Sequence, residues 1–406
     1  MQNSVYPFPV LSGKRLHLGV CGSIAAYKAI ELMRLLQKRE VSVSVTITES
    51  ALRFVPALNF EALGAEMVYT RMFEQGEGVM FGHLEPGQVA QAFMVAPCSA
   101  DAMARIAGGF AGEILCAQVL AFDGPVVIAP AMNPRMWQNK ATQHNLCTLR
   151  ERGYSFVLPE SGEVACGDTG SGKLADLFEL GLAAAKALVP QDLCGKRILL
   201  TLGPTREGWD GVRVWTNLST GLMGACLAQA AYLRGAEVHA VAGPGVPTLP
   251  AGIKRHDVVT AAEMYAAAEQ LWPDASWGIF TAAVADFRPE PHTAGKFKKT
   301  AGEQGLSINF TPTRDILASL AGKAASEQKI LGFAAETERI EEQSREKLQR
   351  KKAHIIAGNL VGGADSGFAS ESNRMYVCDY RGREEHWPLS SKADIAWRLL
   401  DWLSTL

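Results

Sequence analysis

The chain has 406 residues, of which 48% are hydrophobic, and a formal net charge of −2. This length predicts two domains, and the near-neutral charge excludes broad electrostatic capture of nucleic acid or of an anionic membrane. No apolar run approaches the roughly 18 residues that a membrane-spanning helix needs, and no signal peptide is recognisable at the N-terminus. The eight Cys are scattered without a CxxC or a metal-ligand spacing, which favours reduced thiols in a cytoplasmic protein.

The first half of the chain alternates between strand and helix patterns. We expect an unstructured lead up to about Gly13. Apolar runs then predict buried strands, separated by segments with helical spacing, at residues 16–20, 41–48, 93–97, 125–130 and 155–160. This alternation predicts a doubly wound parallel sheet.

The same alternation of strand and helix patterns starts again after a Pro-containing link around Pro190. A strand begins near Lys196, a helix covers residues 225–235, and a further strand covers residues 236–244. Residues 345–352 read as a basic helix. We therefore predict two tandem α/β domains of the Rossmann or flavodoxin-like type, covering residues 1–190 and 191–406.

The segment PAMNPRMW, residues 130–137, carries the clearest functional signal. It follows an apolar strand, so Asn133 lies at the carboxyl end of that strand, where open α/β sheets bind ligands. Pro130 and Pro134 stiffen the loop, and an amide suits a substrate carboxylate or amide. An ordinary Pro-rich β–α loop would give the same pattern.

Two glycine-bearing turns accompany this segment. Gly22 and Ser23 open a helix after the first strand, which makes a ready phosphate site. ACGDTGSGKL, residues 165–174, is a glycine-rich turn that carries Cys166. Its GDTGSGK part imitates a P-loop, but Leu174 stands where that motif needs Ser or Thr, and a loop precedes it instead of a strand.

GSIAAYK, PAMNPRMW and ACGDTG in this order, with His83 in FGHLEP, resemble the flavin-dependent cysteine decarboxylases. The second half resembles the ligase partner in the fused bacterial proteins. The resemblance is to the bifunctional phosphopantothenoylcysteine decarboxylase/phosphopantothenate–cysteine ligase family of coenzyme A biosynthesis, and it extends from about Arg15 to about Trp402.

For the first half, the resemblance implies FMN as the cofactor of a decarboxylation with no net redox change. Asn133 would hold the substrate carboxylate, Cys166 would protonate the enethiolate, and His83 would lie by the flavin and the reacting thiol. Family members form trimers that bring His83 and Cys166 together from different chains. The residues implied in FMN binding are Gly22, Ser23, Ile24, Thr48, Ser99 and Ala100. Ser99 could equally be a plain helix N-cap.

For the second half, the resemblance implies a dimeric ligase that activates 4′-phosphopantothenate with CTP and Mg²⁺, so that cysteine attacks an acyl-cytidylate. Asn217 would hold this intermediate. Lysines suit the triphosphate as point charges, although most basic runs are simply solvated faces. The implied CTP-binding residues are Asp286, Lys296, Arg314, Asp315, Ile316, Leu317, Phe333, Lys347 and Lys351.

Five positions depart from the family pattern. Leu218 and Leu222 replace basic residues, Thr313 and Arg314 replace Asn-Pro, and Leu360 replaces an Asp. A decarboxylase with a weak or vestigial ligase half is therefore one alternative. Others are a non-catalytic flavin-binding regulatory subunit, against which His83, Asn133 and Cys166 argue, and a relative that acts on a peptide C-terminal cysteine, against which the long second half argues.

Overall fold

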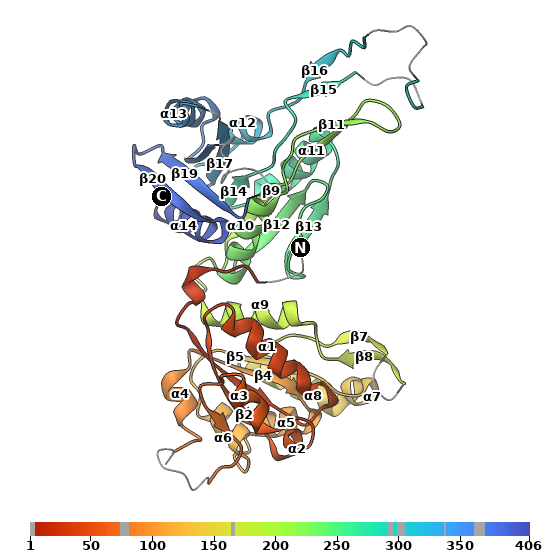
Figure 1. Cartoon of the computed structure of the whole chain (residues 1–406), viewed down its shortest axis with the longest axis vertical. Helices are drawn as coiled ribbons and strands as arrows, with labels where there is room; N and C mark the ends of the chain where they lie inside the picture. The colour runs from red at the N-terminus through yellow and green to blue at the C-terminus, as the bar shows by residue number, and fades with distance from the viewer. Residues whose placement is uncertain are drawn as a thin grey trace. The chain divides into compact units, whose positions relative to one another are not determined.

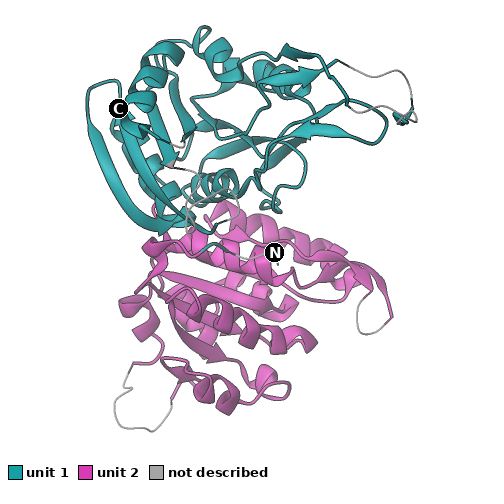
Figure 2. Ribbon diagram, turned by 45° about the horizontal axis from the view of Figure 1, so that its top comes forward, with its two compact units in different colours: residues 1–6, 191–406 teal, residues 7–190 magenta. Residues whose placement is uncertain are grey.

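The computed structural model describes residues 5–73, 81–163, 167–290, 295–298, 305–336, 338–360 and 370–406. The chain divides into two compact units (Figure 2). One unit holds residues 7–190, and the other holds residues 191–406 together with Val5 and Tyr6.

The first unit is built on a six-stranded sheet in which every strand pair is parallel, in the order β3-β2-β1-β4-β5-β6. This strand order is that of the doubly wound dinucleotide-binding fold, as predicted. Figure 1 shows α1 and α9 on one side of the sheet and α5, α6 and α8 on the other. The strands are β1 Arg15–Val20, β2 Ser42–Ile47, β3 Val68–Tyr69, β4 Ala92–Cys98, β5 Val126–Pro130 and β6 Ser155–Phe156.

The helices of this unit follow from its apolar spacing and its polar caps. They are α1 Tyr27–Gln37, α2 Glu49–Leu52, α3 Ala57–Ala62, α4 Glu85–Val89, α5 Ala100–Gly108, α6 Ile114–Leu120, α7 Pro134–Gln138, α8 Lys140–Glu151 and α9 Leu177–Leu188. A hairpin of β7 Glu160–Glu163 and β8 Thr169–Lys173 stands apart from the sheet. The P-loop imitation falls in this hairpin, which has none of the strand–loop–helix geometry of a P-loop.

The expected unstructured lead is wrong for its described part. A single 3₁₀ turn, η1 Pro9–Leu11, lies there, and Phe8 and Leu11 are 2% and 1% exposed. Burial of these apolar side chains supplies the free energy that orders the segment.

The second unit is built on an eight-stranded sheet in the order β13-β12-β9-β14-β17-β18-β19-β20. The first six strands in this order pair in parallel, whereas β18–β19 and β19–β20 are antiparallel. The expectation of a purely parallel second sheet is therefore corrected at one edge, because a short turn between β19 and β20 can only return the chain antiparallel. The strands are β9 Arg197–Leu202, β12 Glu237–Ala242, β13 Lys254–Asp257, β14 Trp277–Phe280, β17 Lys329–Glu336, β18 Ile355–Leu360, β19 Ser372–Asp379 and β20 Glu384–Ser391.

Helices and two small ribbons complete this unit. The helices are α10 Leu222–Leu233, α11 Ala261–Leu271, α12 Ile316–Ala321, α13 Ile340–Lys351 and α14 Lys392–Thr405, with a 3₁₀ turn η3 Trp272–Asp274. The ribbons are β10 Arg206–Gly208 with β11 Val214–Thr216, and β15 Phe287–Pro289 with β16 Phe310–Pro312. The predicted basic segment forms the end of α13.

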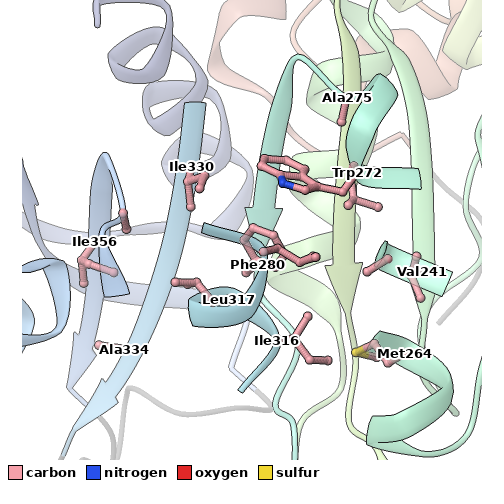
Figure 3. Close-up of a cluster of buried hydrophobic side chains, with 14 of the residues drawn as sticks. Val241, Met264, Trp272, Ala275, Phe280, Ile316, Leu317, Ile330, Ala334 and Ile356 are labelled. Carbon is pink, nitrogen blue, oxygen red and sulfur yellow. The ribbon is translucent and has the colours of Figure 1, made fainter. Parts of the chain in front are cut away.

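A buried apolar cluster fixes the short helix α12 on the sheet. Figure 3 shows Ile316 and Leu317 of α12 beside Phe280 of β14, with Ile330 of β17 nearby. Ile316 and Leu317 are 4% and 8% exposed. Packing at the first turn of α12 places the preceding residues, Arg314 and Asp315, at the carboxyl edge of the sheet.

Candidate active sites

The first unit holds a pocket of about 510 Å³ at the carboxyl ends of β1, β4 and β5. Five of the six predicted FMN-binding residues line it, and so does Asn133. Its described lining is Gly22, Ser23, Ile24, Ala25, Tyr27, Lys28, Ser99, Ala100, Ala131, Met132, Asn133, Met136, Glu163, Gly172, Lys173 and Leu174.

Side-chain caps position three of the predicted residues. Ser23 accepts a hydrogen bond from the Ala25 N–H at 3.2 Å, so a 3₁₀ turn, η2 Ile24–Ala26, precedes α1. Ser99 accepts from the Ala102 N–H at 3.2 Å and caps α5. Ser99 is therefore an N-cap and a pocket residue at once. Thr48 caps α2, is buried and does not belong to the described lining of the pocket.

The PAMN loop is joined to the glycine-rich segment. The Asn133 Nδ2 donates to Asp168 Oδ2 at 2.7 Å, while Asn133 Oδ1 accepts from the Arg135 N–H at 2.8 Å. The Met132 N–H donates to the Gly172 carbonyl at 2.9 Å. A Cβ at Gly172 would lie 2.3 Å from the Met132 oxygen, so only glycine allows this approach. Cys166 lies outside the described residues.

His83 lies in the turn before α4 and is not part of the described lining of this pocket. The Phe81 ring meets its imidazole edge to face, with 6.3 Å between the centroids. The carbonyl of the preceding residue, Gly82, accepts a hydrogen bond from Gln118 Nε2 at 2.8 Å. Within one subunit, His83 and Asn133 are therefore not brought into a common pocket.

The second unit holds a pocket of about 430 Å³ at the carboxyl ends of β9, β14 and β17. Asn217 and eight of the nine predicted CTP-binding residues line it: Asp286, Arg314, Asp315, Ile316, Leu317, Phe333, Lys347 and Lys351. Lys296 is the exception among these predictions. It is exposed and follows Gly295, whose carbonyl accepts from the Gly211 N–H at 3.2 Å.

Local contacts fix the polar groups of this pocket. Asp315 caps α12 through the Ala318 N–H at 3.0 Å and forms an ion pair with Lys351. The Arg314 guanidinium lies 4.4 Å from the centroid of the Tyr265 ring. Asn217 Nδ2 contacts the carbonyls of Ala283 and Val284, each at 3.2 Å, which ties the end of β11 to the segment after β14. These contacts fix the positions of charged and amide side chains that line the same pocket.

Burial sets the electrostatics of the pocket. It lowers the pKa of Lys347, although the nearby carboxylates of Glu336 and Asp286 act in the opposite direction. Burial likewise lowers the pKa of Lys351, again opposed by Asp286. A polyanion placed among these ammonium groups would favour their charged forms, so the pocket suits a nucleotide triphosphate.

Sequence reasoning missed several polar residues at this pocket, among them one lysine and two asparagines. Lys392, at the first position of α14, is 4% exposed, and burial lowers its pKa. Asn359 and Asn373 line the same pocket, and within the described part of the chain their buried Oδ1 atoms have no hydrogen-bond partner. No local motif marks these residues, because distant strands and the last helix bring them together. Lys28 was also missed, although the GSIAAYK motif contains it.

The described ranges, with their gaps, contain no group of three or more His, Cys, Asp or Glu residues arranged to hold a metal ion. The same ranges contain no helix that is long and apolar enough to cross a membrane. The side chain of Leu360, one of the departures noted above, lies outside the described residues.

Two family models cover the chain. Residues 10–183 match the model described as Flavoprotein, and residues 193–406 match that of the DNA/pantothenate metabolism flavoprotein C-terminal domain. The chain thus joins a flavoprotein domain to the C-terminal domain of a DNA/pantothenate metabolism flavoprotein.

Full-length relatives narrow this class. The chain is 38% identical to the coenzyme A biosynthesis bifunctional protein CoaBC of Vibrio vulnificus over 396 residues, which is 98% of either chain. It is 38% identical to the protein of the same name from Escherichia coli, over 97% of this chain and 98% of that one, and 37% identical to that of Bacillus subtilis, over 98% of both. The chain belongs to the family of coenzyme A biosynthesis bifunctional proteins.

Solved structures match each half separately. The C-terminal domain of a coenzyme A biosynthesis bifunctional protein CoaBC is 35% identical, with a TM-score of 0.45, and the match covers 53% of this chain and 97% of that one. A PPC decarboxylase mutant complexed with pantothenoylaminoethenethiol is 30% identical, with a TM-score of 0.39, over 42% of this chain and 95% of that one.

Proposed function

We propose that the chain catalyses two consecutive steps of coenzyme A biosynthesis in the cytoplasm. The second unit joins cysteine to 4′-phosphopantothenate at the expense of CTP, and the first decarboxylates the resulting 4′-phosphopantothenoylcysteine to 4′-phosphopantetheine. The observation that carries the proposal is the presence of two separate pockets, one in each unit, in a chain that matches bifunctional relatives over 98% of its length. Neither a vestigial ligase half nor a regulatory subunit is favoured.

The first pocket fits FMN by its shape and chemistry. Apolar side chains such as Met132 and Leu174 suit a flat ring system, while Lys28 and the helix start at Ser23 suit a phosphate. Bound FMN supplies a hydride acceptor, which allows the substrate thiol to be oxidised before CO₂ leaves and the product thiol to be restored afterwards.

The residues of the chain then bind and protonate the substrate. Asn133, held by Asp168, donates to the carboxylate and orients the bond that breaks. Cys166 donates a proton to the substrate carbon that carried the carboxylate before CO₂ left. A thiol suits this step because it gives and regains a proton near neutral pH. His83 contacts the reacting thiol from a neighbouring subunit of a trimer, because it does not line the pocket of its own subunit.

In the second pocket, Lys347, Lys351 and Arg314 bind the triphosphate of CTP. Mg²⁺ accompanies the nucleotide, usually held through phosphates and one or two carboxylates, and Asp286 is an exposed carboxylate beside these lysines. The pantothenate carboxylate attacks the α-phosphate and releases pyrophosphate, and cysteine then displaces CMP from the acyl-cytidylate that Asn217 holds. Lys296 does not line this pocket, so its role in CTP binding rests on the resemblance to the family alone.

One assay tests both activities. Purified protein is incubated with 4′-phosphopantothenate, cysteine, CTP and Mg²⁺, and the expected products are 4′-phosphopantetheine, CO₂, CMP and pyrophosphate. If no pyrophosphate appears at saturating substrates, the ligase proposal fails. If added 4′-phosphopantothenoylcysteine releases no CO₂ from FMN-loaded protein, the decarboxylase proposal fails and a regulatory flavin-binding role replaces it.

Subunit mixing tests the shared site. We expect His83→Asn and Cys166→Ser homo-oligomers each to form little 4′-phosphopantetheine, whereas co-expression of the two variants restores part of its formation, because some sites then combine two intact residues. Light scattering of the full chain should also show a homo-oligomer, with trimeric decarboxylase and dimeric ligase contacts. A monomer, or mixed oligomers without activity, would contradict a site between subunits.

A further inference from the structure

A chain of buried polar side chains crosses the first unit, and neither pocket explains it. His17 of β1 contacts Ser44 Oγ through Nδ1 at 2.7 Å and Thr46 Oγ1 through Nε2 at 2.8 Å. Thr46 Oγ1 contacts Gln118 Oε1 of α6 at 2.6 Å, and Gln118 Nε2 contacts the Gly82 carbonyl at 2.8 Å. His17, Thr46 and Gln118 are at most 1% exposed.

Each hydrogen bond in this network has a definite donor and a definite acceptor. The Gly82 carbonyl can only accept, so the amide nitrogen of Gln118 faces it and the amide oxygen faces Thr46. Thr46 then donates to Gln118 and accepts from the Nε2–H of His17, which leaves Nδ1 to accept from the Ser44 hydroxyl. This order needs a neutral imidazole, and burial lowers the pKa of His17 to about 3.

The network ends at the residue that precedes His83. Apart from the backbone bonds of the turn itself, such as Leu84 N–H to the Phe81 carbonyl at 2.8 Å, the Gln118 contact ties this turn to the interior of the unit. Gln118 in turn contacts β2, which is paired with β1 at the centre of the sheet. Because a fully hydrogen-bonded buried network is rigid, it fixes the backbone from which the imidazole of His83 projects.

We propose that Gln118, oriented by Thr46 and His17, is the positioning residue for His83 in the decarboxylase reaction. The inference rests on the proposed function of the first unit, in which His83 meets the reacting thiol. Gln118 and His17 do not line the decarboxylase pocket, so their effect passes through the Gly82 carbonyl. Displacement of a reacting group by about 1 Å can slow a reaction by about 100-fold.

The test uses the full FMN-loaded chain and 4′-phosphopantothenoylcysteine, with flavin reduction followed in a single turnover. Gln118→Leu removes the donor and should slow flavin reduction about tenfold or more, with FMN content and ligase rate unchanged. Gln37→Leu is the matched control, since its Nε2 also donates to backbone carbonyls, those of Leu63 and Gly64, away from His83. Equal rates for Gln118→Leu and the wild type would overturn the inference, while an inactive wild type would overturn the proposed function.

Two further measurements separate positioning from loss of packing. In a His83→Asn background, Gln118→Leu should cause little additional slowing, because the residue that it positions is already gone. Gln118→Glu should retain activity at low pH, where the buried carboxyl is protonated and donates to Gly82, and should lose it as rising pH ionises that carboxyl. Additive losses in the double variant, or a pH profile for Gln118→Glu that matches the wild type, would contradict the inference.

Discussion

Asn133 donates a hydrogen bond from Nδ2 to Asp168 Oδ2 at 2.7 Å, and this bond joins two segments that the sequence keeps 35 residues apart. This hydrogen bond orients the side-chain amide of Asn133. With Oδ1 occupied by the Arg135 N–H, the Asn133 amide is held on both sides. Asp168 also lies two residues after Cys166, so one carboxylate connects the proposed carboxylate-binding residue with the segment of the proposed proton donor.

We predict that Asp168→Ala lowers the kcat/KM of decarboxylation about tenfold or more, since a hydrogen bond to a charged group contributes roughly 1.5–3 kcal/mol. Steady-state CO₂ release measures this, and FMN content should stay normal. Arg135→Gln is the control. Arg135 contacts Asp168 at 3.6 Å with a side chain that is 85% exposed, and such exposed ion pairs contribute little. Equal losses in the two variants would show that the Asn133 contact is unimportant.

Cys166→Ser should stop the first unit after CO₂ loss. A serine hydroxyl is a much weaker acid than a thiol, so the enethiolate would remain unprotonated and the flavin would stay reduced. Mass spectrometry of the quenched reaction should detect an enethiol product, together with bleached flavin absorbance. Cys147→Ser, at an exposed free cysteine, should turn over normally. Full turnover by Cys166→Ser would remove Cys166 from the mechanism.

Gly22→Ala should weaken FMN binding. A Cβ at Gly22 would lie 2.6 Å from Ser50 Cβ, so the turn that presents Ser23 and Ile24 to the pocket must shift. We expect purified Gly22→Ala to carry substantially less FMN than the wild type, measured by flavin released on denaturation. Gly112→Ala, where an added Cβ meets nothing within 4 Å, should retain it. Full FMN occupancy in both variants would place the cofactor elsewhere.

The sequence predicted those parts of the molecule that depend on local pattern. Strand apolarity and strand–helix alternation predicted the first sheet, and the position of Asn133 after β5 follows from the same pattern. The bond between Asn133 and Asp168 was not predictable, because it depends on how the β7–β8 hairpin folds back on the PAMN loop. The antiparallel edge of the second sheet was missed for a related reason, since burial patterns do not encode strand direction.

The roles of buried polar residues were also not predictable from the sequence. His17 and Gln118 interrupt apolar segments without forming a motif, and their role is visible only when four side chains meet in space. Lys392 enters the ligase pocket from the last helix, which nothing in its neighbourhood indicates. Lys296 illustrates the opposite case, because the family pattern assigned it to CTP while its position does not line the pocket.

CTP affinity should fall as pH rises, and Lys347 should be responsible for part of this. Burial lowers the pKa of Lys347 and Lys351 below the ordinary 10.5, and a bound triphosphate raises both again. Binding is therefore strongest below the lowered pKa values and weakens above them, with proton uptake in between. Calorimetry in two buffers of different ionisation heat measures that uptake.

Lys347→Gln should weaken CTP binding about tenfold or more and reduce the pH dependence, since a cation next to a triphosphate is lost. Arg350→Gln removes the same charge from an exposed position on α13 that does not line the pocket, so its effect should be small. Equal weakening by the two variants would show that CTP senses only the general positive charge of α13.

The stability of the first unit should decline in mild acid because of His17. The unfolded chain binds a proton at this imidazole with a pKa near 6.5, whereas in the folded state burial lowers the pKa to about 3. The unfolded state therefore binds more protons between these values. Stability is constant above pH 6.5 and falls below it, with a slope that approaches roughly 1.4 kcal/mol per pH unit for this one group.

His17→Gln tests this, because an amide offers a donor and an acceptor to Ser44 and Thr46 but does not titrate. We expect hydrogen-exchange protection of β1 and β2 in the full chain, corrected for intrinsic exchange, to fall less steeply below pH 6.5 in this variant. His144→Gln, at an exposed imidazole of the same unit, should keep the wild-type slope. An unchanged slope in His17→Gln would mean that the folded unit accepts a proton at His17, which contradicts both its neutral state and the single direction of the hydrogen-bond chain toward His83.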